Sequence, residues 1–224
     1  MKSLDGVSAI IRFPKPGVEM FPEEKVRNEV AAIQYSQDNT SIPVPFVPHC
    51  GTKEESPLGF GPFIVMDYID HVNTMSDVFT TPGLGISECH YLDPKVDVEM
   101  LEMMHGQFAG ILLQLNRLSL PRIGSMECLE EFSYEVDNRP LSLHMDELVR
   151  LGTLPRSALP DSTFSISSSY SDNLAELHME HLKHQHDDAV ESATDYRHKY
   201  VPRQLFRRLA KNRRLSASSV GMGA

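Results

Sequence analysis

The chain has 224 residues, 41% of them hydrophobic, and a formal net charge of −10. A chain of this length can form one sizeable domain or two lobes that share a cleft. The acidic balance argues against a nucleic-acid-binding protein, and no apolar run approaches the roughly 20 residues that a membrane span requires.

The basic residues are concentrated at one end. Residues 1–196 carry 13 basic and 31 acidic side chains, whereas residues 197–224 carry eight basic side chains and no acidic one. Such a segment can bind phosphate, an acidic partner or an anionic membrane, and it can equally be the solvated end of a helix. We expect no nucleic-acid or membrane partner, and the oligomeric state does not follow from the pattern.

The three cysteines are Cys50, Cys89 and Cys128, with no C-x-x-C pair among them. Widely spaced cysteines of this kind indicate free thiols in a reducing compartment. The first six residues, Met-Lys-Ser-Leu-Asp-Gly, contain no apolar signal region. These features predict a cytoplasmic protein.

The first 70 residues combine strand and helix signals. An apolar run over residues 7–13 predicts a strand, which Pro14, Pro16 and Gly17 end. Pro22 suits the first position of a helix, and apolar residues recur after it at helical spacing. The prolines of residues 41–48 predict an extended segment, and the β-rich residues 63–69 predict a central strand.

After Pro94 the pattern becomes helical. Residues 71–94 are irregular, and residues 98–118 form a strong amphipathic helix whose apolar stripe is expected to lie in a core. Gly106 and Gly110 on this helix have the spacing of a close helix–helix contact. A short strand near residue 126, a short helix near residues 145–151, and long helices over residues 170–193 and 195–215 follow. Pro202 predicts a kink in the last helix, or its true start.

The expected fold is therefore α+β. A small mixed α/β lobe covers residues 1–70, a mostly helical lobe covers residues 71–214, and residues 215–224 form a disordered tail.

Arg12 ends the first expected strand, and Glu29 lies on the helix that follows it. In the small lobe of a protein kinase, a cation that ends a V-A-I-K strand holds the nucleotide phosphates, and a glutamate on the next helix holds that cation. Here Ala9-Ile-Ile-Arg12 occupies the first place and Glu29 the second. Arginine binds phosphate and forms bidentate pairs with carboxylates, so this pair can serve the same purpose.

Several segments in this order resemble the fungal branch of the aminoglycoside phosphotransferase family, which has a protein-kinase-like fold. They are Ile-Ile-Arg12-Phe-Pro, Glu24-Lys-Val-Arg-Asn-Glu29-Val, Ile42-Pro-Val-Pro, Gly61-Pro-Phe-Ile-Val-Met66-Asp67-Tyr68-Ile69, Arg122-Ile-Gly-Ser125 and Arg197-His-Lys-Tyr-Val-Pro-Arg-Gln-Leu-Phe206. Members transfer the γ-phosphate of ATP to a hydroxyl group of a small molecule and use magnesium. The resemblance implies a partial two-lobed, kinase-like fold.

The resemblance also implies roles for individual residues. Arg12 would contact the phosphates of ATP and Glu29 would orient Arg12. Met66 would guard the back of the adenine pocket, and Asp67 and Tyr68 would meet the base. The small-molecule acceptor is unknown.

Two parts of the family's active site have no counterpart in the sequence. The glycine-rich turn over the phosphates would precede Asp5, and no aspartate is followed five residues later by a metal-binding asparagine. We therefore expect a chain truncated at both ends, with no assignable catalytic residue or metal ligand and little or no phosphotransfer on its own. The alternatives are a non-catalytic, pseudokinase-like binding or scaffold protein and a truncated gene model.

His178, His181 and His184 recur every three residues. Three imidazoles on one helix face can bind zinc or nickel. The competing interpretation is a solvated helix face, which we favour.

Overall fold

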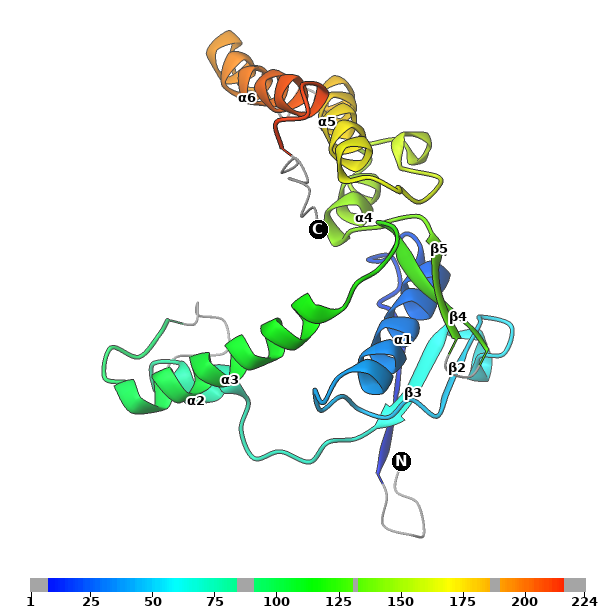
Figure 1. Cartoon of the computed structure of the whole chain (residues 1–224), viewed down its shortest axis with the longest axis vertical. Helices are drawn as coiled ribbons and strands as arrows, with labels where there is room; N and C mark the ends of the chain where they lie inside the picture. Colours follow the sequence, from blue (N-terminus) through cyan, green and yellow to red (C-terminus); the bar gives the residue numbers. More distant parts are fainter. Residues whose placement is uncertain (1–7, 84–90, 131–132, 186–189, 216–224) are drawn as a thin grey trace, which may run out of the picture. The chain divides into compact units, whose positions relative to one another are not determined.

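The computed structural model of the protein describes residues 8–83, 91–130, 133–185 and 190–215. It is of mixed α+β class, with a three-stranded sheet in the order β1-β3-β2 and a two-stranded antiparallel sheet of β4 and β5 (Figure 1). The strands are β1 (Ala9–Arg12), β2 (His49–Gly51), β3 (Phe63–Asp67), β4 (Ser125–Glu130) and β5 (Ser133–Asn138). The helices are α1 (Pro22–Asn39), α2 (Met75–Phe79), α3 (Val98–Arg117), α4 (Leu143–Arg150), α5 (Ser167–His184) and α6 (Ala193–Lys211).

The chain divides into two compact units that alternate along the sequence. Unit 1 comprises residues 1–11, 33–49 and 65–119, and unit 2 comprises residues 12–32, 50–64 and 120–224. The lobe boundary expected after residue 70 stays a prediction.

Unit 2 contains an apolar core built around α4. Met145 and Leu148 of α4 are almost fully buried, and they pack with Leu177 of α5 and with the loop residues Leu154 and Leu159. Burial of such side chains contributes roughly 1.5–3 kcal/mol each to folding. Met20 and Phe21, which directly precede α1, pack against this core, so it also fixes the start of that helix.

Both ends of α4 are capped by local sequence. The Ser142 side chain accepts a hydrogen bond from the Met145 amide at 3.2 Å, as an N-cap serine does. After the helix, Gly152 has a φ of 70°, and the amides of Gly152 and Thr153 donate to the carbonyls of Val149 and Leu148. This pattern is a Schellman motif, in which glycine accepts the left-handed backbone conformation without a steric penalty.

The long helices α5 and α6 of unit 2 lie side by side (Figure 1). Arg207 of α6 donates to Glu176 of α5 at 2.7 Å, and Lys211 lies 3.3 Å from the same carboxylate. Pro202 lies inside α6, whose first residue is Ala193. The prediction that Pro202 marks the start of the last helix is therefore wrong.

Unit 1 contains the carboxyl-terminal part of α1 together with α2 and α3. The helix α2 was not expected in the irregular segment 71–94, although Thr74 and Asp77 form a capping box at its start. Helix α3 has the predicted position, but none of its residues is buried, and Phe108 is 54% exposed. The expectation that its apolar stripe lies in a core is thus wrong, because α2 is too short to cover a helix of 20 residues.

Cys50 and Cys128 are free thiols, as expected. Cys89 and the expected tail disorder of residues 216–224 lie outside the described residues. Among the residues that the structure does describe, no helix is long and apolar enough to cross a membrane.

Candidate functional site

Arg12 and Glu29 form an ion pair in unit 2. Arg12 is the last residue of β1, and its Nη2 donates a hydrogen bond to Oε1 of Glu29, which lies on α1. The Arg12 side chain is 47% exposed and that of Glu29 is 29% exposed. The geometry therefore holds a guanidinium group at the surface while part of it stays accessible to a ligand.

A second ion pair lies beside the first. Lys25 of α1 donates through Nζ to Oε1 of Glu19, whose side chain is only 14% exposed. Lys25 and Glu29 are four residues apart on α1, so they occupy the same helix face. Sequence reasoning missed this pair. Lys25 lies in a segment that carries the resemblance but was given no role, and Glu19 lies in none of those segments.

Both ion pairs line one cavity of about 500 Å³. Three cations and two carboxylates surround it, which leaves one positive charge in excess. Its charged residues are Arg12, Lys15, Glu19, Lys25 and Glu29, and its apolar wall consists of Phe13, Pro14, Val18, Val26, Ile64 and Leu143. A cavity whose polar lining carries an excess of cations can bind an anion.

The amino-terminal end of α1 is held in place by Arg139. Its Nε and Nη2 donate to the two oxygens of Glu24 at 2.8 and 2.6 Å, and its guanidinium lies 4.7 Å from the centre of the Phe21 ring. The hydrogen bond to Glu24 raises the pKa of Arg139. Because this bidentate pair fixes the start of α1, it also fixes the helix face that carries Lys25 and Glu29.

Asp146 holds the chain just before α1. The residue is buried, and its Oδ1 accepts a hydrogen bond from the Met20 amide at 2.9 Å. Asp146 also lines a smaller cavity of about 120 Å³, which shares Glu19, Lys25 and Leu143 with the cavity beside Arg12. The segment that carries Glu19 is therefore anchored from the side of α4.

Met66, Asp67 and Tyr68 belong to unit 1, whereas Arg12 and Glu29 belong to unit 2. Met66 is buried in β3, and its role at the back of an adenine pocket stays a prediction. The amide of Asp67 donates to the Phe46 carbonyl, and the amide of Tyr68 donates to the Ser8 carbonyl, both at 2.9 Å. These two amides are thus used within unit 1, so a bound base would have to meet other backbone groups of this segment.

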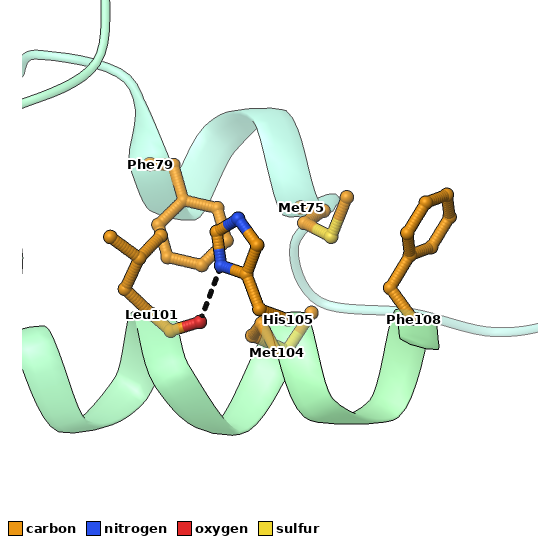
Figure 2. Close-up of a pocket in the computed structure, with 6 residues that line it drawn as sticks. All are labelled: Met75, Phe79, Leu101, Met104, His105 and Phe108. Atoms are coloured by element: carbon orange, nitrogen blue, oxygen red, sulfur yellow. Dashed lines mark hydrogen bonds between the residues drawn. The ribbon is translucent and has the colours of Figure 1, made fainter. Parts of the chain in front are cut away.

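A second, apolar pocket lies between α2 and α3 in unit 1 (Figure 2). Its volume is about 180 Å³, and it is lined by Met75, Phe79, Leu101, Met104, His105 and Phe108. The Nδ1 of His105 donates to the Leu101 carbonyl at 2.8 Å, so the polar edge of this ring is already engaged within the helix. An adjoining pocket of about 290 Å³ adds Met100, Met103 and Val78 to the same surface. Methionine-rich surfaces adapt to apolar groups of varied shape, and the side chains that line this one include no carboxylate, lysine or arginine to orient a ligand.

The three histidines of α5 do not form a metal site. Among the described residues, no group of three or more histidine, cysteine or acidic side chains has metal-binding geometry. The competing interpretation of a solvated face is also wrong for His181, which is buried on α5 and lies 3.0 Å from the side-chain amide of Gln185. Burial, together with the charge of Arg203, lowers the pKa of His181 to about 4.

His178, on the same helix, lies close to aromatic rings of two other helices. Its ring lies 6.2 Å from that of His144 on α4 and 5.8 Å from that of Phe206 on α6. Burial lowers the pKa of His178 as well, so both imidazoles are neutral at pH 7. The ring of His178 packs α5 against α4 and α6, which is a structural role.

Comparisons with protein-family models, with curated proteins and with solved structures found no match for the chain.

Proposed function

We propose that the cavity beside Arg12 binds the phosphate groups of ATP, in a chain related to small-molecule kinases of the aminoglycoside phosphotransferase type. The observation that carries the proposal is the Arg12–Glu29 pair, in which a strand-end cation is held by a carboxylate of the next helix. Kinase-like small lobes hold the nucleotide phosphates with this arrangement. A partial two-lobed, kinase-like fold belongs to the same proposal.

The chemistry of the cavity supports phosphate rather than a neutral ligand. A guanidinium group has five N–H donors, and one of them is used by Glu29. The remaining donors can form charge-assisted hydrogen bonds with phosphate oxygens, which are among the strongest that proteins make. Lys15 adds an exposed cation at the rim of the same cavity.

Magnesium, which the family resemblance implies, is not given a protein site by these residues. Glu19 and Glu29 line the cavity, and each is paired with a cation. Magnesium is commonly bound through substrate phosphates together with only one or two carboxylates. In the proposed complex the ion would reach the cavity with the nucleotide.

The test is equilibrium binding of ATP to the purified chain, with and without magnesium. We expect Arg12→Ala to weaken binding by at least about tenfold, the order expected for the loss of a charge-assisted hydrogen bond. Arg150→Ala is the matched control, because Arg150 also pairs with a glutamate, Glu147, but lies on α4 and does not line the cavity. Equal affinity of the wild type and Arg12→Ala would contradict the proposal.

The second candidate function is a non-catalytic binding protein of pseudokinase type. The observation that favours it is the exposed apolar surface of α3, which includes Phe108, Leu112 and Leu113. Exposed apolar patches often mark surfaces that bind other proteins. Binding of ATP to the wild type and to Arg12→Ala discriminates between the two functions: a protein that only binds partners through α3 should show no affinity for ATP that depends on Arg12.

A further inference from the structure

The pair formed by Lys25 and Glu19 adds a feature to the phosphate site proposed above, and its role depends on that proposal. Lys25 is one helical turn from Glu29, and residues four apart on a helix have Cβ atoms about 5–6 Å apart. Glu29 in turn holds Arg12. The ammonium group of Lys25 and the guanidinium group of Arg12 therefore lie along the wall of the same cavity.

Glu19 holds Lys25 in much the same way as Glu29 holds Arg12. Its side chain is more enclosed than that of Glu29, with exposed fractions of 14% and 29% respectively. An enclosed carboxylate is tolerated only when a cation or hydrogen-bond donors compensate its charge, and the Lys25 ammonium group supplies such a charge. The two pairs are thus built alike, each with a cation that lines the cavity and a carboxylate that restrains it.

The ammonium group keeps donors for a ligand. A lysine has three N–H donors, and the bond to Glu19 uses one of them. The side chain is 34% exposed, so a ligand in the cavity can reach it. The two cations are restrained by different carboxylates in one cavity, so a ligand with two linked phosphate groups can engage each cation with a separate phosphate.

We propose that Lys25 is a second phosphate-binding residue, and that Arg12 and Lys25 together select anions with at least two linked phosphate groups. The ligand class is then a nucleoside diphosphate or triphosphate, or an inorganic polyphosphate. A monophosphate binds more weakly because it offers fewer oxygens and less negative charge to the two cations.

The experiment measures calorimetric binding of orthophosphate, pyrophosphate, ADP and ATP to the full chain at one fixed ionic strength. The wild type should bind pyrophosphate at least about tenfold more tightly than orthophosphate, the order expected for one additional charge-assisted hydrogen bond. Lys25→Gln should remove most of that preference and leave orthophosphate binding within about threefold of the wild type. Lys183→Gln is the matched control, because it also removes one charge and one lysine–glutamate pair, but on α5.

A second variant separates binding from folding. Lys25→Arg keeps a cation at this position and should keep the preference for pyrophosphate. If Lys25→Arg is as weak as Lys25→Gln while both melt at the temperature of the wild type, the charge of Lys25 does not bind phosphate and the proposal fails. It fails equally if the wild type does not prefer pyrophosphate over orthophosphate.

The outcomes also separate this inference from the proposed function. If ATP binding depends on Arg12 but not on Lys25, the nucleotide site stands and the role of Lys25 is wrong. If pyrophosphate binding depends on Lys25 but ATP binds no more tightly than pyrophosphate, the inference stands and the nucleotide assignment is wrong.

Discussion

The cavity beside Arg12 and the pocket between α2 and α3 differ in how their side chains are held. Around the cavity, Glu29 and Glu19 hold the cations Arg12 and Lys25, and Arg139 anchors α1, the helix that carries Lys25 and Glu29. Around the pocket, methionine and phenylalanine side chains lie on helices of which no residue is buried. The cavity is preorganised for a charged ligand, whereas the pocket offers only apolar surface area and side chains that adapt to the shape of a ligand.

The largest expected effect tests the close packing of the unit that contains the cavity. A Cβ atom on Gly124 would lie 2.5 Å from the Asn138 carbonyl oxygen and 2.7 Å from Cγ2 of Thr163. We expect Gly124→Ala to lower the free energy of unfolding by about 3 kcal/mol, because a backbone atom cannot move aside easily. Urea unfolding measures this free energy. A loss below about 0.5 kcal/mol, the range of an ordinary surface substitution, would show that the residues around Gly124 are not closely packed.

The next effect is a pH dependence of stability from His181. Its pKa falls from 6.5 in the unfolded chain to about 4 in the folded protein, so the unfolded chain binds more protons between these values. Stability is therefore full above about pH 6.5 and declines as the pH falls toward 4. The free energy of unfolding should be about 1–2 kcal/mol lower at pH 5 than at pH 7, as measured with urea.

The matched variant for this pH dependence is His181→Gln. Glutamine does not titrate, so this variant should show a smaller difference between pH 7 and pH 5 than the wild type does. His184→Gln is the control, because His184 is an exposed residue of the same helix. An unchanged pH dependence in His181→Gln would contradict the burial of this imidazole.

A similar or slightly smaller effect is expected from the anchor of α1. Glu24→Gln leaves Arg139 without its carboxylate, and the pair is largely shielded from solvent, with side-chain exposures of 20% for Arg139 and 30% for Glu24. We expect a loss of about 1–2 kcal/mol in unfolding free energy together with weaker pyrophosphate binding. Lost stability with unchanged pyrophosphate affinity would show that the anchor does not position the cavity.

The smallest effect tests the open packing around α3. A Cβ atom on Gly106 or Gly110 would meet no atom of the described residues within 4 Å, so the close helix–helix contact predicted from their spacing is not formed within this part of the chain. Alanine is more favourable than glycine in a helix by up to about 1 kcal/mol. Gly106→Ala should therefore raise the free energy of unfolding by about 0.5–1 kcal/mol, and a decrease would reveal a partner surface against this face.

The two regions also differ in how far the sequence predicts them. The start of α1 at Pro22 and the position of α3 follow from local spacing, because helical periodicity depends on near neighbours. The ion pair of Arg12 with Glu29 was predicted from the order of segments in the kinase-like pattern. The pair of Lys25 with Glu19 was not predicted, since it depends on the path of the chain between β1 and α1. The burial of His181 was missed because it depends on what packs against α5, which the spacing of histidines along one helix does not reveal.

The exposure of α3 was the other failure of sequence reasoning. An amphipathic stripe shows that a helix has an apolar face, but it does not show what covers that face. The short helix α2 could have been found from Thr74 and Asp77, which have the spacing of a capping box before an apolar pair.

The most direct test of the central claim compares the affinities of ATP and adenosine for the wild type and for Arg12→Gln. If the cavity beside Arg12 binds the phosphates, the wild type prefers ATP by at least about tenfold, and Arg12→Gln lowers the affinity for ATP toward that for adenosine while adenosine binding itself is unchanged. An equal preference for ATP in both proteins would contradict the account, because the phosphates would then be bound elsewhere.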